Sequence, residues 1–445
     1  MCKKRWNIKT VTVIGANGTM GKNIAAIFAS FGNAKIYLVS RTLEKSVIAK
    51  DEAYKSVRAE SAKNKMIPCD YSQLEACVRE SDLIFEVCAE DWKIKEGIHK
   101  RIAKFVEQEG EGKIFCSGTS GLPVTQLAKL YPDKYRHQFM GLHMFNPPYH
   151  MTLCELIPTV YTERDRSIFD FVKSYAEGVL YRTVVEVADT PAFLGNRIGF
   201  QFINEALQIA DKFRHSGGID YIDSIIGSFT GRTMPPLVTA DFVGLDVHKA
   251  IVENIYENTK DYAHENFNLP EFVKLLISKG KIGRKTNGGL YKTIFCDDGS
   301  KILQVYDIVH GHYRKRINYT FPFVEEMVDS LEVGDYETAF HTLVENESVE
   351  AKLCCELLLK YIVYALNTAK ELGCETGAAD DVMATGFHWC PPLAMYQAFA
   401  TVTDISSLCE ARLDCQVMDV IKQRHLFDNL KMSRYDYRKF ILAKH

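Results

Sequence analysis

The sequence lacks the features that define several classes of protein. None of its 445 residues lies in an apolar run of the ~18 residues that a membrane-spanning helix needs. Its thirteen cysteines show no C-x-x-C spacing, so we expect buried reduced thiols rather than a zinc site or a disulfide framework. The formal net charge of -3 leaves no basic stripe, which argues against nucleic acid and membrane surfaces as partners.

Two further absences concern the chain's location. There is no low-complexity segment, and the basic start MCKKRWNIKT leads into a strand pattern without the apolar region of a signal peptide. We therefore expect a cytoplasmic protein. Its 47% apolar and 25% charged residues are typical of a globular protein with two or three domains.

The first part of the chain alternates between strand and helix patterns. Short apolar runs, typical of buried strands, are separated by amphipathic stretches. The runs occupy 10–15, 35–40, 83–88, 113–118, 138–145 and 182–188. This alternation predicts an α/β fold with a Rossmann-type, doubly wound parallel sheet over residues 1–190.

The rest of the chain is mainly helical. We predict an all-α domain at 191–292, a linker with short strand signals at 293–320, and a second helical domain at 321–445. The second domain repeats a pattern of the first, because both run through glycine and aromatic residues to a Pro-Pro-Leu turn, at Pro235 and at Pro391. Such a duplication predicts an internal pseudo-dimer within a monomer, with a homodimer as the alternative.

A nucleotide-binding turn is indicated by VTVIGANGTMGKNIAAIF at 11–28. A strand, closely spaced glycines and a helix start together present backbone N–H groups to a pyrophosphate. The residues expected to contact the cofactor here are Gly15, Asn17, Gly18, Thr19, Met20 and Gly21. The glycines are spaced one residue wider than G-x-G-x-x-G, which makes the motif atypical of NAD binders.

The end of the second predicted strand favours NADP, with NAD as the other possibility. NAD binders usually place an acid there for the ribose 2′-hydroxyl, whereas this chain has Ser40 and Arg41. A hydroxyl and a guanidinium suit a 2′-phosphate, which a carboxylate would repel. Alternatively, Arg41 is simply a solvated residue at a helix start.

The segment GLHMFNPPYHMTLCELIP at 141–158 carries the candidate chemistry. His143 ends a predicted strand, and Glu155 follows twelve residues later, after a proline turn. A histidine paired with a carboxylate can serve as a general acid or base near neutral pH. His150 is better interpreted as a loop residue than as a second base.

This segment resembles the L-3-hydroxyacyl-CoA dehydrogenase family, whose members carry a G-L-H-F-F-N-P pattern and a paired glutamate. The likeness continues in order through FEVCAEDWKIK (85–95), SGTSGL (117–122), PAFLGNRI (191–198), FVGLDV (242–247) and GRKTNGGLYK (283–292). The C-terminal repeat is similar to the duplicated helical domain of longer family members. No separate segment is left for a hydratase domain.

The resemblance implies specific roles. His143 would be the catalytic base, Glu155 would orient it, and Ser120 and Asn196 would hold the reacting end of the substrate. The positions that match cofactor contacts are Glu90, Lys95, Ser120, Asn146 and Lys285; those that match contacts to the CoA substrate are Ser56, Lys63 and Ser120. Without the family pattern, Ser120 would be interpreted as a turn serine, Asn196 as a helix cap and Lys63 as a solvated charge.

The sequence departs from the family at three further points. The family usually has Asn where Gly118 stands, an acid where Ser40 stands, and Gly-Pro where this chain has Met234-Pro235-Pro236. The first departure bears on the nicotinamide contacts and the second on NAD itself. The third bears on the acyl pocket or on the interface of the helical domain.

The resulting prediction is an NAD(P)-dependent 3-hydroxyacyl-CoA dehydrogenase that takes an acyl-CoA substrate and needs no metal. One alternative is a related dehydrogenase of a free hydroxy acid, such as carnitine or gulonate dehydrogenase, and another is a non-catalytic cofactor-binding protein. The C-terminal repeat shows no counterpart of Asn196, so we expect it to be structural rather than a second binding unit.

Overall fold

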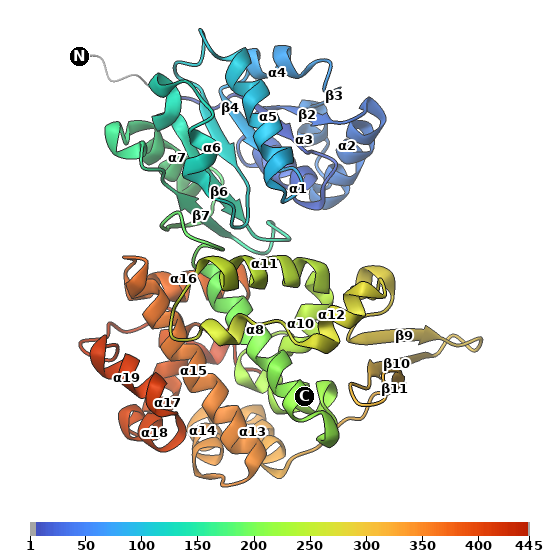
Figure 1. The fold of residues 1–445 in the computed structure, drawn as a ribbon, viewed down its shortest axis with the longest axis vertical. Coiled ribbons are helices and arrows are strands. Elements are labelled where there is room, and N and C mark those ends of the chain that lie inside the picture. Colours follow the sequence, from blue (N-terminus) through green and yellow to red (C-terminus); the bar gives the residue numbers. More distant parts are fainter. Residues whose placement is uncertain (1–5, 444–445) are drawn as a thin grey trace. The chain divides into compact units, whose positions relative to one another are not determined.

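The structure, a computed structural model, describes residues 6–443, so the basic residues at 3–5 lie outside the described residues. The chain divides into two units, one up to Phe193 and one from Leu194 onward (Figure 1). No described helix is both long enough and apolar enough to cross a membrane. Every cysteine within 6–443 is free, and these residues hold no group of three or more side chains suited to a metal ion.

An eight-stranded sheet forms the centre of the first unit, in the order β3-β2-β1-β4-β5-β6-β7-β8. The strands are β1 (Thr10–Ile14), β2 (Lys35–Ser40), β3 (Met66–Asp70), β4 (Leu83–Glu86), β5 (Ile114–Ser117), β6 (Phe139–Met144), β7 (Leu153–Ile157) and β8 (Thr183–Glu186). All neighbours are parallel except β6 and β7. The predicted doubly wound sheet is confirmed, and its strand order changes direction between β1 and β4, where such sheets bind ligands.

Helices cover this sheet, and their apolar faces form the core with the strands (Figure 1). They are α1 (Thr19–Ser30), α2 (Leu43–Val57), α3 (Glu60–Lys65), α4 (Leu74–Glu80), α5 (Trp92–Phe105), α6 (Val124–Ala128) and α7 (Ser167–Gly178). The amphipathic stretch at 42–65 forms two helices, because Arg58 adopts a left-handed conformation with φ of 50° between them. This conformation ends a right-handed helix.

Two strands of the sheet were absent from the sequence prediction. β3 contains Pro68, which argues against a central strand, but β3 lies at the sheet edge, where proline is tolerated. β7 follows the proline turn after β6 and runs back beside it. This antiparallel direction results from the chain turning back on itself, and no pattern within residues 153–157 indicates it.

The second unit is helical. Its helices are α8 (Gly195–Lys212), α9 (Ile219–Ile225), α10 (Pro236–Val243), α11 (Leu245–Asn258), α12 (Glu271–Ser278), α13 (Pro322–Glu332), α14 (Tyr336–Glu345), α15 (Val349–Glu371), α16 (Thr376–Gly386), α17 (Pro392–Ala400), α18 (Ile405–Arg412) and α19 (Cys415–Gln423). The range described above as a linker largely folds as an antiparallel sheet of β9 (Tyr291–Phe295), β10 (Lys301–Tyr306) and β11 (Tyr313–Lys315).

The two Pro-Pro turns occupy equivalent places in two series of helices. A long helix, a short helix and a helix that begins with proline follow one another as α8, α9 and α10, and again as α15, α16 and α17. The series meet closely: a Cβ added to Gly199 of α8 would overlap the ring of Phe387. Arg232 and Trp389, which precede the two Pro-Pro turns, form an antiparallel bridge.

Candidate active site

The register between β6 and β7 places the two predicted catalytic residues face to face. His143 on β6 is the direct cross-strand partner of Glu155 on β7. Side chains of directly paired residues lie on the same face of a sheet, within reach of each other. The His143 Nδ1 atom lies 2.8 Å from Glu155 Oε2. A carboxylate at this distance can accept a hydrogen bond from Nδ1–H, which leaves Nε2 of the neutral ring free to accept a proton from another group.

The surroundings of this pair are largely apolar. Only 5% of His143 is exposed, and Glu155 is fully buried. The imidazole packs against the ring of Phe145, at 4.6 Å between centroids, and against that of Phe193, at 5.6 Å. Restricted access of water strengthens the charge interaction of an imidazolium with Glu155.

The glycine turn has the geometry of an anion-binding helix start. The amide of Gly18 donates to the carbonyl of Gly15 at 3.0 Å, so the wider glycine spacing forms a closed four-residue turn. Gly15 has φ of 89°, and a Cβ there would lie 2.7 Å from the carbonyl oxygen of Val87. Within the described chain, no side chain caps the start of α1, so its first N–H groups remain available to a phosphate.

The end of β2 combines an exposed cation with an orphaned hydroxyl. Ser40 is buried, and its Oγ atom has no hydrogen-bond partner among the described residues. Arg41 is exposed just before α2, whose N-terminus adds partial positive charge. These features fit a cofactor with an oxygen-rich group at this position.

The loop after β5 is held in place by an acid. Glu90 Oε1 accepts the backbone N–H of Ser120 at 2.9 Å and the hydroxyl of Thr119. Glu90 Oε2 lies 3.5 Å from Lys95 Nζ. Three predicted site residues, Glu90, Lys95 and Ser120, thus lie together, although Lys95 is fully buried and has no exposed surface to offer a ligand.

The remaining predicted residues are distributed over both units. Asn146 is exposed directly after β6 in the first unit. In the second unit, Asn196 is buried in the first turn of α8, and Lys285 pairs with Asp246 at 2.6 Å. The structure describes each unit by itself, so the positions of these two residues relative to His143 stay predictions.

The two residues predicted to contact CoA lie on neighbouring helices. The Ser56 hydroxyl on α2 donates to Asn23 Oδ1 on α1 at 3.0 Å. Lys63 on α3 pairs with Asp51 at 3.2 Å and lies over the ring of Tyr54. Their part in substrate binding stays a prediction.

Comparison with known proteins identifies the family. Residues 10–190 match the NAD binding domain of 3-hydroxyacyl-CoA dehydrogenase, and residues 193–293 match its C-terminal domain. The chain is 32% identical to the mitochondrial hydroxyacyl-coenzyme A dehydrogenase of Sus scrofa over 306 residues. This alignment covers 65% of the chain and 92% of that protein. The chain belongs to the 3-hydroxyacyl-CoA dehydrogenase family.

Longer relatives extend the match beyond residue 293. A probable 3-hydroxyacyl-CoA dehydrogenase of Bacillus subtilis is 28% identical over 418 residues, which cover 88% of this chain and 51% of the relative. The chain thus spans about half the length of that relative. The crystal structure of a 3-hydroxybutyryl-CoA dehydrogenase from Escherichia coli K12 matches with a TM-score of 0.67 and 17% identity, over 95% of this chain and 99% of that one. This likeness shows that the fold is shared.

One departure from the family pattern has a structural explanation. A Cβ added to Gly118 would lie 2.9 Å from a ring carbon of Phe85. Phe85 is fully buried on β4 and fills this space. A side chain at 118 therefore requires the Phe85 ring to shift.

The sequence analysis missed the carboxylate beneath Lys95. Glu86 ends β4 and is fully buried, with hydrogen bonds from Lys95, Ser117 and His99. The signal that could have revealed it is an acid inside the apolar run LIFEVC, because an acid in such a run is rarely left unpaired.

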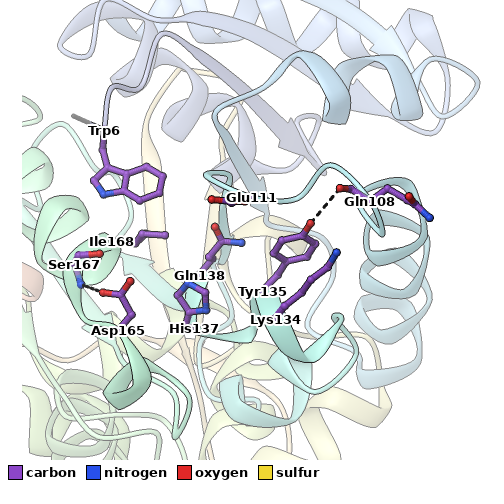
Figure 2. Close-up of a pocket in the computed structure, with 10 residues that line it drawn as sticks. All are labelled: Trp6, Gln108, Glu111, Lys134, Tyr135, His137, Gln138, Asp165, Ser167 and Ile168. Atoms are coloured by element: carbon purple, nitrogen blue, oxygen red, sulfur yellow. Dashed lines mark hydrogen bonds between the residues drawn. The ribbon is translucent and has the colours of Figure 1, made fainter. Parts of the chain in front are cut away.

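A cavity of about 790 Å³ in the first unit lies away from these residues. Figure 2 shows its lining, which includes Trp6, Glu111 and His137. Trp6 precedes β1, Glu111 precedes β5 and His137 precedes β6, so the cavity lies at the amino ends of the strands. His143 and the glycine turn lie at the carboxyl ends, and the cavity shares no residue with the candidate active site.

Proposed function

We propose that this chain is an NAD(P)-dependent dehydrogenase that interconverts a (3S)-3-hydroxyacyl-CoA and a 3-oxoacyl-CoA. The observation that carries the proposal is the buried pair of His143 and Glu155, joined at 2.8 Å at the carboxyl edge of the sheet. The family and the relatives' names support the same chemistry.

In the oxidative direction, His143 Nε2 takes the proton of the substrate's 3-hydroxyl. In the neutral ring, an Nδ1–H bond to Glu155 leaves Nε2 as the proton acceptor, and the carboxylate then stabilises the imidazolium. When bound, the nicotinamide cofactor provides the acceptor for the hydride that leaves C3. In the reductive direction, the imidazolium returns its proton to the oxygen.

Two donors would fix the reacting oxygen. We assign this role to Ser120 and Asn196, whose hydroxyl and amide groups can stabilise negative charge as it develops. Ser56 and Lys63 would contact the CoA portion. The glycine turn and the uncapped start of α1 would hold the cofactor's pyrophosphate.

We assign the cofactor as NADP in preference to NAD. Arg41 is exposed at the end of β2, and the neighbouring Ser40 hydroxyl has no partner among the described residues. Ser40 is only 1% exposed, so Arg41 is the side chain that offers a ligand accessible surface at this point. The 2′-phosphate of NADP would supply oxygens and charge for its guanidinium.

The test is the absorbance at 340 nm with acetoacetyl-CoA, with NADPH and NADH compared in parallel. Rapid oxidation of NADPH and slow oxidation of NADH is the expected result. The reverse preference would keep the reaction and remove the NADP assignment. If neither cofactor is oxidised with the thioester, the same assay with free 3-oxo acids separates a free-acid dehydrogenase from a non-catalytic protein.

A further inference from the structure

A buried polar network lies beneath the loop that carries Ser120. Its centre is Glu86, whose carboxylate accepts from Lys95 Nζ at 2.9 and 3.1 Å and from the Ser117 hydroxyl at 2.7 Å. His99 Nε2 lies 3.3 Å from the same carboxylate, and its Nδ1 lies 2.9 Å from the Tyr131 hydroxyl. All five side chains are buried.

The charges in this network are fixed by mutual contact. Burial alone would raise the pKa of Glu86, but the hydrogen bond with His99 and the charge of Lys95 hold it well below its usual range. Burial opposes the charge of Lys95, yet Glu86 and Glu90 raise its pKa. Glu86 and Lys95 therefore form an ion pair in the protein interior.

The tautomer of His99 follows from its neighbour. The ionised Glu86 carboxylate can only accept a hydrogen bond, so His99 Nε2 donates to it. Burial raises the pKa of Tyr131 well above its usual range, so its hydroxyl keeps its proton at 2.9 Å from Nδ1. His99 and Tyr131 thus form a chain of contacts that ends on the Glu86 carboxylate.

Lys95 connects this interior pair with the exposed loop. Its ammonium lies 3.5 Å from Glu90 Oε2, while Glu90 Oε1 accepts the N–H of Ser120 at 2.9 Å. Glu90 is partly exposed at 38%, and a carboxylate in such a position can adopt several rotamers. The buried ammonium contacts this carboxylate in the conformation that accepts the Ser120 N–H.

We propose that Glu86, supported by His99, is a positioning residue that sets the Ser120 loop through Lys95 and Glu90. Its effect on turnover rests on the proposed role of Ser120 in binding the substrate oxygen. Its effect on the loop does not depend on that role, because the chain of contacts is complete within the first unit.

The first measurement is backbone amide hydrogen exchange over residues 117–122 of the full chain, without ligand. Glu86→Gln keeps the shape of the side chain but removes its charge, so we expect exchange at Ser120 to accelerate by about 10-fold or more. Glu86→Gln combined with Lys95→Met removes both fully buried charges, so no ion is left unpaired in the interior, which protects the test against misfolding. It should produce the same acceleration.

The matched control is Thr12→Val. Thr12 is fully buried on β1, and its hydroxyl bonds to Ser81 at 2.7 Å, away from the loop. This variant should lose stability without faster exchange at 117–122. Unchanged exchange at Ser120 in the folded double variant would overturn the proposal, as would acceleration of the same size in Thr12→Val.

The kinetic readout separates positioning from a loss of folded protein. A merely structural defect lowers kcat with KM unchanged, whereas a displaced loop should also raise KM for the cofactor or the thioester. Unchanged KM for both the cofactor and the thioester, together with unchanged exchange at Ser120, would count against the proposal. If the wild-type chain shows no turnover at all, the proposed function fails while the exchange experiment still decides the role of Glu86.

Discussion

The strand pairing around His143 determines which of its atoms can act on a substrate. Glu155 faces His143 across a single antiparallel pair, so a shift of one residue in register would turn the carboxylate to the other face of the sheet. Because Glu155 holds Nδ1, Nε2 is the atom left for proton transfer. The fold therefore sets the position of the His143 ring and favours Nε2 as the atom of the proposed base.

Replacing this base should abolish most of the proposed activity. We expect His143→Ala to lower kcat by roughly 10²–10⁴-fold with little change in cofactor affinity, because proton transfer is lost while the glycine turn is intact. Turnover of acetoacetyl-CoA and titration with NADPH measure the two effects. His150→Ala, which alters an exposed histidine seven residues away, is the control and should remain active. Full activity of His143→Ala would exclude the assignment.

The cofactor preference depends on the charge of one residue. Arg41→Asp should weaken NADPH binding by about 10- to 100-fold, the range for a lost hydrogen bond to a charged group, and should change NADH binding much less. Fluorescence titration with each cofactor measures this difference. Lys55→Asp makes the same change of charge at the far end of α2 and should affect both cofactors equally. If Arg41→Asp lowers the affinity for NADPH and for NADH equally, the NADP assignment is contradicted.

At the scale of elements, two helices share one capping device. Asp223 of α9 accepts the N–H groups of Leu237 and Val238 at the start of α10, at 2.9 and 3.1 Å. Asp380 of α16 accepts the N–H of Leu393 at the start of α17, at 2.8 Å. Both capped helices begin with proline, which lacks one of the amide protons that the helix start would otherwise leave unpaired.

The cap at Asp223 should make stability depend on pH. Burial raises the pKa of Asp223 to about 7, against the hydrogen bonds from Tyr291, Leu237 and Val238. The unfolded value is near 3.9, so between about pH 4 and pH 7 the folded chain holds a proton that the unfolded chain has lost. Its contribution to stability therefore falls as pH rises through this range.

Asp223→Asn removes this titration. It also lowers the stability by an amount that does not depend on pH, because the amide NH₂ group replaces one of the carboxyl oxygens that accept hydrogen bonds. Relative to the wild type, we expect its free energy of unfolding to rise by roughly 2–3 kcal/mol between pH 5 and pH 7.5. Denaturant unfolding at several pH values measures the difference. The control is Asp335→Asn, since Asp335 caps α14 at the surface and its hydrogen bonds with Thr338 lower its pKa. If the difference in free energy of unfolding between Asp223→Asn and the wild type stays constant over this pH range, the pKa of Asp223 is not raised.

At the scale of the whole chain, the second helical series covers the first. Arg197 of α8 is buried and pairs with Glu371 of α15 at 3.0 Å and with Asp261 at 2.7 Å. Phe202 of α8 packs against Tyr361 of α15, with ring centroids 5.8 Å apart. We propose that this arrangement is an internal pseudo-dimer, in which the C-terminal repeat is structural.

A chain that ends at residue 320 would lose α13 to α19 and expose the face of α8. We expect this truncated chain to dimerise or aggregate, whereas the full chain stays a monomer, because large exposed apolar patches drive association. Size-exclusion chromatography with light scattering measures the masses. If the truncated chain is a monomer and unfolds at the same temperature as the full chain, the repeat does not cover this face.

Much of this protein could be predicted from local patterns. Alternating apolar runs and amphipathic stretches gave the sheet with its helices, and six motifs in order gave the family, because both depend on residues close together in sequence.

Tertiary structure alone decided the relations between distant segments. The antiparallel β7, the sheet of β9 to β11 and the network around Glu86 each depend on pairings that no local period encodes. Lys95 illustrates the difference, since the sequence gives its family position but only packing shows that its ammonium is buried on Glu86. The physical reason is that side-chain period and turn chemistry are local, whereas strand direction, register and the pairing of buried charges are fixed by the whole fold.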